Sequence, residues 1–481
     1  MTDASTVPTP AERAASSPRF ADRLEFAGAR ALVLGARVAG ASAARALVRL
    51  GCSVLVTDAG PARLGGGLPE GAEFLGAVEV IPDGIDLVVT SPGLRPDQFL
   101  LQQAYQRGLP VFGELEFAWR IRGNDPAAWL MITGTNGKTT TVRMLEAVLR
   151  SAGLRALAVG NVGVPIIDAV LADPGYDVLA VEASSFQLHH SATIAPLAGA
   201  LLNVAPDHLD WHGTMSAYAR EKTKVFAGDT AIGNADDPTV LARLEEAATS
   251  RLTFSTHHGG PGSYGVVDGL LRDAQGRVLL PAAEIRPPGE HNVANALAAA
   301  ALAETAGVGP EQIAAGLRAF VPDPHRNQLV ATVSDVDYVD DSKATNPHAA
   351  DASLAAYPSV VWIAGGQLKG APIAELVDRH APRLRAAVLL GQDRDLIASA
   401  LARHAPDVPV ITVSRTDDGA MQEVVAAAAS LAHASDVVLL APAGASLDMF
   451  ASYSARGESF ARAVGQLPGA VTGPVPPEQP R

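Results

Sequence analysis

Residues 128–140 read AWLMITGTNGKTT and join a short apolar run, a glycine-rich loop and the start of a segment with helical spacing. Backbone N–H groups of such a loop point at a phosphate, and the helix that follows adds a partial positive charge at its N-terminus. We expect Lys138 to reach the β- and γ-phosphates of a nucleotide and the Thr139 hydroxyl to hold Mg²⁺. The alternative is a glycine-rich turn with a surface lysine. The loop is also two residues shorter than the usual G-x-x-x-x-G-K-[ST] pattern.

Short apolar runs alternate with segments of helical spacing from Ala29 onward, which is typical of βαβ units and a parallel sheet. The alternation restarts at Ala128 and near Leu329, and a chain of 481 residues fits about three domains. The sequence therefore predicts an α/β protein with a flexible arm, a Rossmann-like domain, a central P-loop ATPase-type domain, a C-terminal Rossmann-like domain and a flexible tail. The expected bounds are 1–20, 21–121, 122–321, 322–467 and 468–481, in that order.

Composition excludes several classes of function. The 37 basic and 51 acidic residues give a net charge of −14, which argues against nucleic acid as the main partner. Cys52 is the only cysteine, so neither an intrachain disulfide framework nor a cysteine zinc cluster can form. The chain has no apolar run long enough for a membrane span and no signal peptide at its start. We expect a cytoplasmic protein, and a monomer.

A second glycine-containing turn lies near the N-terminus. GARVAG, residues 35–40, follows an apolar run and precedes a helical segment, and Asp58 ends the next apolar run 23 residues after Gly35. This spacing resembles a dinucleotide-binding fold, in which the acid meets a ribose. The pattern lacks the middle glycine, so the close approach of an NAD pyrophosphate would be harder.

The middle region contains three polar residues that are candidates for a functional site. Two of them follow apolar runs, and the third lies on a face of a predicted helix. Glu182 ends the run VLAVE, which places a carboxylate well for Mg²⁺ near a phosphate loop. His208 follows a further run. Lys222 shares a helix face with Tyr218 and Phe226, which are four residues away on either side. By itself Lys222 would be interpreted as a solvated lysine.

TGTNGKTT, residues 133–140, resembles the ATP loop of the Mur ligase family, which includes folylpolyglutamate synthases and joins amino acids to carboxylates at the expense of ATP. The resemblance extends over about residues 29–466 and includes EASSFQL, DHLDWH, YAREKTKVF, DDSKATN and ASLDMF, which begin at residues 182, 207, 218, 340 and 445. EASSFQL looks specifically like the D-glutamate-adding branch. The resemblance implies that the chain adds D-glutamate to UDP-N-acetylmuramoyl-L-alanine through an acyl phosphate, in the peptidoglycan synthesis that serves cell shape and division.

The resemblance also implies a nucleotide and metal site with two Mg²⁺ ions. Asn292 and Asn295 would face the adenine and Asp341 would bond the ribose, whereas Arg326 is followed by Asn327 and Gln328 and so departs from the family pattern. The implied ATP contacts are Gly134, Thr135, Asn136, Gly137, Lys138, Thr139, Thr140, Asn292, Asn295, Arg326 and Asp341. The implied metal ligands are Thr139, Glu182, His208 and Lys222, the last carbamylated by CO₂. The implied catalytic residues are Lys138, Lys222, Lys343 and His208.

The two other substrates would occupy the outer domains. In this family the first domain holds UDP, which implies contacts with Arg37, Val38, Ala39, Gly40, Ser91 and Gly93, and Asn161 would contact the muramoyl group. In the third domain the implied D-glutamate contacts are Thr345, Lys369, Ser446 and Tyr453. A dianionic amino acid needs at least one cation and several donors, which fits this set. An acyl phosphate must be protected from water, which favours closure of the third domain over the second.

Two other classes of function remain open. A sister ligase for another amino acid, or one for folate glutamates, would share GTNGKTT but lack the carboxylate contacts implied for Lys369 and Ser446. A dehydrogenase or a non-catalytic nucleotide sensor would use the first domain and would not require DDSKATN.

Overall fold

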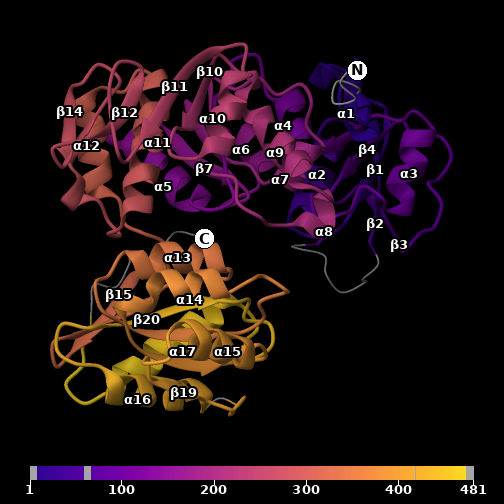
Figure 1. Ribbon diagram of the computed structural model, residues 1–481. Helices are drawn as coiled ribbons and strands as arrows, with labels where there is room; N and C mark the ends of the chain where they lie inside the picture. The colour runs from indigo at the N-terminus through magenta and orange to yellow at the C-terminus, as the bar shows by residue number, and fades with distance from the viewer. Residues whose placement is uncertain (1–7, 59–66, 418, 473–481) are drawn as a thin grey trace, which may run out of the picture. The chain divides into compact units, whose positions relative to one another are not determined.

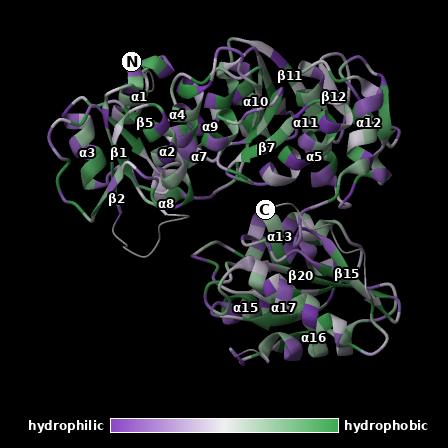
Figure 2. Cartoon of the chain, turned by 180° about the vertical axis from the view of Figure 1, so that it is seen from behind, coloured by the Kyte–Doolittle hydropathy of each residue, from purple (hydrophilic) through white to green (hydrophobic). Residues whose placement is uncertain are grey.

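The computed structural model describes residues 8–58, 67–417 and 419–472. The chain forms two compact units (Figure 1). Unit 1 comprises Met1–Ala282 and Ala294–Phe320, and unit 2 comprises Ala283–Val293 and Val321–Arg481. Each unit is an α/β assembly in which hydrophobic residues of both strands and helices form the core (Figure 2).

Unit 1 begins with a five-stranded parallel sheet of order β3-β2-β1-β4-β5. The apolar run predicted from Ala29 forms β1, and the run that ends at Asp58 forms β2. The elements of this part are α1 (Pro10–Ala15), η2 (Arg23–Phe26), β1 (Arg30–Leu34), α2 (Val38–Arg49), β2 (Ser53–Thr57), β3 (Ala72–Gly76), β4 (Leu87–Thr90), α3 (Phe99–Gln106), β5 (Val111–Gly113) and α4 (Glu114–Ile121).

The second sheet of unit 1 has nine strands in the order β14-β13-β12-β11-β10-β9-β6-β8-β7. Its strands are parallel except at β13 and β14, which were not predicted and pair antiparallel. The elements are β6 (Ala128–Thr133), α5 (Lys138–Ser151), β7 (Ala156–Gly160), α6 (Ile166–Val170), β8 (Val178–Glu182), α7 (Ser185–His189), β9 (Ala198–Leu201), α8 (Leu209–His212), α9 (Met215–Thr223), η3 (Lys224–Ala227), β10 (Thr230–Asn234), α10 (Pro238–Glu245), β11 (Ser250–Ser255), β12 (Ser263–Val267), β13 (Leu270–Arg272), β14 (Val278–Pro281), η4 (Ala282–Glu284), α11 (Glu290–Thr305) and α12 (Pro310–Ala319).

The two sheets of unit 1 share one hydrophobic core, since Val33 of β1 and Met131 of β6 belong to the same cluster of buried side chains. Burying apolar surface contributes about 25 cal/mol per Å², so this shared cluster favours holding the first two sheets together.

Unit 2 contains a seven-stranded sheet of order β19-β18-β17-β20-β16-β15-β21, in which β15 pairs antiparallel with β16 and β21. Val339 and Tyr338, adjacent in β16, belong to different core clusters, because successive side chains of a strand point to opposite faces. The elements are β15 (Gln328–Val333), β16 (Val336–Asp340), α13 (Pro347–Ala355), β17 (Val360–Gly365), α14 (Ala374–His380), η5 (Ala381–Arg383), β18 (Leu384–Leu390), α15 (Arg394–His404), β19 (Val410–Thr412), α16 (Ala420–Leu431), β20 (Val437–Ala443), α17 (Tyr453–Gly465) and β21 (Val471–Thr472).

The structure describes residues 8–20 and 468–472 of the two segments that were predicted to be flexible. Residues 10–15 form α1, and β21 pairs with β15. Residues 1–7 and 473–481 of the predicted arm and tail lie outside the described residues. Among the residues described, no helix is long and apolar enough to cross a membrane.

Candidate functional site

The glycine-rich loop lies between β6 and α5, as predicted. Gly137 caps α5 with φ of 84°, a left-handed conformation that favours glycine, and a Cβ atom there would collide with the Asn295 side chain. The Lys138 side chain folds back over the loop, and its Nζ donates to the carbonyl oxygens of Gly134 at 2.8 Å and Thr135 at 2.7 Å. The loop therefore presents the N-terminus of a 14-residue helix and a lysine at the same place.

Neighbouring side chains fix the shape of this loop. Asn203 accepts from the Asn136 N–H at 2.8 Å and donates to the Asn136 carbonyl at 3.1 Å. The Thr135 hydroxyl hydrogen-bonds the Tyr218 hydroxyl at 3.2 Å. Sequence reasoning missed Asn203. Its signal is a polar residue that follows β9, the strand beside β6.

Glu182 ends β8, next to β6 in the sheet, and is 2% exposed. Its Oε1 accepts from the Asn161 side chain at 2.9 Å, while its Oε2 is buried without a hydrogen-bond partner. Burying a carboxylate oxygen without a hydrogen-bond partner costs free energy, and a bound cation would supply the missing partner. Asn161, predicted to contact the muramoyl group, lies against this carboxylate.

Lys222 is buried on α9, with 1% of its surface exposed, contrary to its interpretation as a solvated lysine. Its Nζ donates to the Gly134 carbonyl at 2.8 Å, the same oxygen that Lys138 contacts. Burial, and then the charge of Lys138, hold the pKa of Lys222 well below its usual range, against the opposing effect of Asp207 and Glu182. The structure thus brings Lys138, Lys222 and the glycine-rich loop together and places Glu182 near them.

His208 lies at the start of α8 in a left-handed conformation with φ of 52°. Its ring packs against Phe186, and its Nε2 lies 3.5 Å from the Asp207 carboxylate. The side chain is 46% exposed, unlike those of Glu182 and Lys222. Among the described residues no group of three or more His, Cys, Asp and Glu side chains lies close enough together to hold a metal ion.

The predicted UDP residues lie at the carboxyl edge of the first sheet. Arg37 caps α2, Val38, Ala39 and Gly40 form its first turn, and Ser91 and Gly93 follow β4. Gly35 has φ of 97°, and a Cβ atom there would collide with the Ser91 side chain, whose buried Oγ has no hydrogen-bond partner. Asp58 accepts from the Ala36 N–H at 2.8 Å, so this acid orders the turn itself.

In unit 2 the predicted residues lie in loops that follow parallel strands. Lys343 and Thr345 follow β16, Lys369 follows β17 and Ser446 follows β20, so these loops share one edge of the sheet. Backbone hydrogen bonds between Gln367 and Ala445, both 2.8–2.9 Å, join the loops of Lys369 and Ser446. Lys369 is exposed with φ of 53°, and Ser446 is 4% exposed.

Lys343 and Tyr453 lie together, with the lysine Nζ 4.0 Å from the centre of the tyrosine ring. Asp341 accepts from Ser353 and from the Asn327 N–H, and burial raises the pKa of Asp341 to about 6. The charge of Arg326 acts on Asp341 in the opposite direction. Asn292 lies in the first turn of α11 and donates to the Pro288 carbonyl at 3.3 Å.

Two further contacts in unit 2 were not predicted. Arg456 is buried and donates to the Ser342 hydroxyl at 2.9 Å, the Ser342 carbonyl at 2.8 Å and the Gly444 carbonyl at 3.0 Å. His325 pairs with Asp340 through its Nδ1 at 2.6 Å. Both contacts fix the loop that carries Lys343. The only sequence signals were the arginine in RGESF and the histidine before Arg326.

Two family models match this chain: the Mur ligase middle domain over residues 132–303, and the Mur ligase, glutamate ligase domain over residues 325–444. The phosphate loop, Glu182 and Lys222 lie within the first range, and Lys343 and Lys369 lie within the second, whereas the first sheet precedes both. The chain belongs to the Mur ligase family.

Among its relatives are two proteins named UDP-N-acetylmuramoylalanine--D-glutamate ligase. The protein of Thermobifida fusca (strain YX) is 54% identical over 468 residues, which cover 93% of this chain and 100% of the relative. That of Streptomyces coelicolor (strain ATCC BAA-471 / A3(2) / M145) is 48% identical over 466 residues, which cover 92% and 99%.

Solved structures of low identity share the fold. The UDP-N-acetylmuramate-alanine ligase of Thermotoga maritima aligns with a TM-score of 0.57 at 17% identity, over 90% of this chain and 98% of that chain. A MurF ligase of the same organism, in complex with ADP, aligns with a TM-score of 0.54 at 18% identity, over 79% and 88%. These alignments confirm the predicted α/β fold class.

Proposed function

We propose that this chain is an ATP-dependent, ADP-forming ligase that adds D-glutamate to UDP-N-acetylmuramoyl-L-alanine in peptidoglycan precursor synthesis in the cytoplasm. The main support for this chemistry is that Lys138 and Lys222 both donate to the Gly134 carbonyl oxygen, in the phosphate loop beside the N-terminus of α5. The choice of D-glutamate is supported by relatives of 45–54% identity whose names specify it.

In the first step a carboxylate oxygen of UDP-N-acetylmuramoyl-L-alanine attacks the γ-phosphorus of ATP, and the bond to the bridging oxygen of ADP breaks. Both reactants are anionic, so the developing charge must be neutralised. We assign that role to Lys138 on the phosphate loop and to Lys343 in unit 2. The products of this step are ADP and the acyl phosphate.

Thr139, Glu182, His208 and a carbamylated Lys222 are the proposed magnesium ligands. Magnesium, when bound, would offset the charge of the phosphate oxygens. Glu182 fits this role through its buried oxygen that has no partner, and the Thr139 hydroxyl lies in the first turn of α5. A hard divalent cation prefers oxygen ligands, and two ions would need more anionic oxygen than Glu182 supplies.

Carbamylation of Lys222 by CO₂ would supply that oxygen. The reaction requires the neutral amine, and the burial of Lys222 beside the charge of Lys138 favours loss of its proton. The cation first loses one proton. The neutral amine then attacks CO₂, and formation of the N–C bond releases a second proton and leaves the anionic carbamate. The negative charges of Glu182 and Asp207 act in the opposite direction and favour the lysine cation. A metal ion bound beside them would offset these charges and favour the neutral amine.

In the second step the neutral amine of D-glutamate attacks the acyl carbon and forms the C–N bond. The tetrahedral intermediate then breaks its C–O bond to phosphate, and the proton that the nitrogen loses leaves with the phosphate or passes to solvent. The proposed contacts of the two D-glutamate carboxylates are Lys369 and Ser446, with Thr345 and Tyr453 beside them. UDP would contact Arg37, Val38, Ala39, Gly40, Ser91 and Gly93, with Asn161 at the muramoyl group. Asn292, Asn295, Arg326 and Asp341 would contact the nucleoside of ATP.

Phosphate release tests this function, measured with ATP, Mg²⁺, UDP-N-acetylmuramoyl-L-alanine and one amino acid at a time. We expect turnover with D-glutamate and background with L-glutamate, glycine, L-alanine and meso-diaminopimelate. Turnover with another amino acid would keep the ligase class and overturn the assignment of the D-glutamate contacts. No turnover with any of them would contradict the proposed activity.

Lys369→Ala is expected to raise the KM for D-glutamate about 10–100-fold with a smaller change in the KM for ATP, because a hydrogen bond to a charged group contributes about 1.5–3 kcal/mol. Steady-state kinetics with each substrate varied in turn provides the measurement. Arg403→Ala, which removes an exposed cation from α15 in the same unit, is the matched control. An unchanged KM for D-glutamate would remove Lys369 from the proposed contacts.

A further inference from the structure

Residues 8–20 of unit 1 form an N-terminal arm segment that a buried arginine attaches to the rest of the unit. Arg120 of α4 donates to the carbonyl oxygens of Ala15 at 2.7 Å, Ser17 at 3.0 Å and Phe20 at 3.2 Å. Phe20 is itself buried, at 4% exposure. A buried guanidinium needs acceptors, and the backbone of the arm segment supplies them together with the Glu116 carboxylate, which accepts from Arg120 at 2.7 Å.

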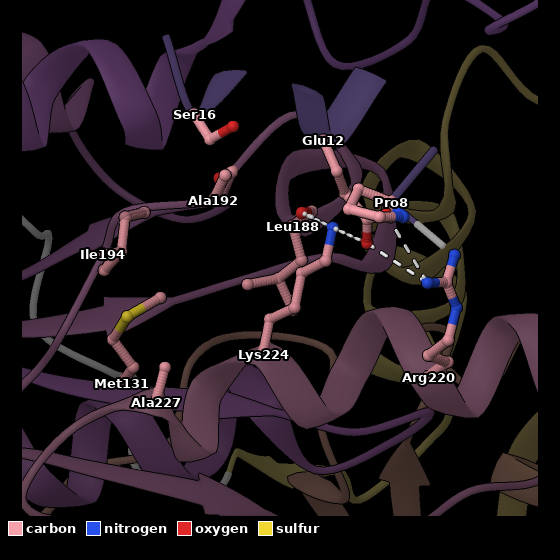
Figure 3. A pocket seen from close by; sticks show the side chains of 11 residues that line it. Pro8, Glu12, Ser16, Met131, Leu188, Ala192, Ile194, Arg220, Lys224 and Ala227 are labelled. Atoms are coloured by element: carbon pink, nitrogen blue, oxygen red, sulfur yellow. Dashed lines mark hydrogen bonds and ion pairs between the residues drawn. The ribbon is translucent and has the colours of Figure 1, made fainter. Parts of the chain in front are cut away.

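Glu12 connects the arm segment to α9. Its carboxylate accepts from the Thr9 N–H at 2.7 Å and lies 3.3 Å from Arg220 and 3.4 Å from Lys224 (Figure 3). These two cations also pair with Glu221, at 3.6 Å and 2.7 Å. The Glu12 side chain is only 16% exposed, so these contacts are better shielded from solvent than an ordinary surface pair.

A cavity of about 370 Å³ lies between the arm segment and the neighbouring elements β6, α7, α9 and η3. Glu12 and Ser16 line one side of it, and Met131 of β6, Leu188 of α7 and Lys224 line the other (Figure 3). Beside the cavity, Figure 3 shows the ion pairs that link the arm segment directly to its neighbours: Glu12 pairs with Arg220 of α9 and with Lys224 of η3.

Helix α9 has two functional faces. On one face Tyr218 and Lys222 contact the phosphate loop, through Thr135 at 3.2 Å and Gly134 at 2.8 Å. On another face Arg220 pairs with Glu12, and so does Lys224, the first residue of η3, which directly follows α9. A shift of α9 away from the arm segment would therefore move Tyr218 and Lys222 relative to the loop.

We propose that Glu12 is a positioning residue, and that the arm segment holds α9 so that Lys222 and Tyr218 keep their places against the phosphate loop. The inference rests on the proposed function only for its kinetic readout. Its second readout, nucleotide affinity, depends on the position of the phosphate loop and does not require the ligation reaction. It gives a role in the ligation reaction to a segment that contributes none of the proposed substrate contacts.

Glu12→Gln tests the proposal, because it keeps the size of the side chain and removes its charge. We expect kcat to fall about 5-fold and the Kd of a non-hydrolysable ATP analogue to rise about 3-fold, below the 10–100-fold typical of groups that directly orient metal ligands. The bicarbonate concentration that gives half-maximal activity is expected to rise by a similar factor. The Tm should stay within about 3 °C of the wild-type value, because ion pairs near the surface contribute little stability.

Glu73→Gln is the matched control, since it removes the same charge from an exposed position on β3. Glu12→Asp keeps the charge and is expected to restore at least half of the lost kcat. Wild-type kcat and analogue affinity in Glu12→Gln would overturn the proposal, as would an equal loss in Glu73→Gln. Failure of the proposed function can be told apart from failure of this inference. If the proposed function is wrong, the wild-type chain releases no phosphate with D-glutamate, and the affinity for the ATP analogue still tests the role of Glu12.

Discussion

Lys138→Ala is expected to lower phosphate release about 100–1,000-fold while the chain stays folded, since removing one preorganised donor to a developing charge has an effect of this size. The wild-type side chain hydrogen-bonds two carbonyls of its own loop, at 2.7–2.8 Å, and is not fully buried. Its loss therefore removes a charge from the phosphate site without opening a cavity in the core. Phosphate release at saturating D-glutamate and a thermal melt provide the two measurements.

Arg150→Ala is the control for this variant. Arg150 lies in the last turn of the same helix, α5, and its side chain is 57% exposed. Turnover in this control should stay close to wild type, which separates a change at the loop from a general loss of helix stability. Unchanged turnover in Lys138→Ala would mean that the glycine-rich loop is not the ATP site.

Lys222→Ala is expected to lower activity at least about 100-fold, with partial recovery when a short carboxylate such as acetate is added, because groups that complete or orient a metal site contribute about 10–100-fold or more. The wild-type enzyme should lose activity in CO₂-depleted buffer and regain it with bicarbonate. The physical reason is the position of Lys222, which is 1% exposed and beside Lys138, where a lysine cation is disfavoured.

The matched control for rescue is Lys138→Ala, whose activity acetate should not restore, because an added anion cannot replace a lost cation. Full activity of Lys222→Ala without any added carboxylate would contradict the carbamate. Activity that is lost and not recovered by a carboxylate would instead assign Lys222 a role as a cation or as a structural support of Gly134.

Local patterns were sufficient to predict the strands that place the site. The apolar run that restarts the pattern at Ala128 is β6, the restart near Leu329 is β15, which begins at Gln328, and the helix after the glycine-rich loop begins at Lys138. These elements are encoded by neighbouring residues, so apolar runs and glycine positions reveal them. The family resemblance then added the chemistry that spacing alone could not supply.

Contacts between distant parts of the chain were not predictable in the same way. Helical spacing placed Lys222 on one face with Tyr218, but the partner of that face, Gly134, lies 88 residues earlier. The composition of residues 1–20 predicted flexibility, whereas Arg120 supplies the donors that order Ala15 to Phe20. In both cases the burial of a charged group depends on a tertiary partner that the local sequence does not contain.

The most direct test of the proposed ligation follows an oxygen isotope. UDP-N-acetylmuramoyl-L-alanine labelled with ¹⁸O in its alanyl carboxylate is incubated with the enzyme, ATP, Mg²⁺ and D-glutamate, and the phosphate and the amide product are analysed by mass spectrometry. Attack of the carboxylate on the γ-phosphorus predicts one ¹⁸O atom in each phosphate released and a product heavier by one glutamyl residue. Unlabelled phosphate, or labelled AMP, would contradict the acyl phosphate and with it the proposed ligation mechanism.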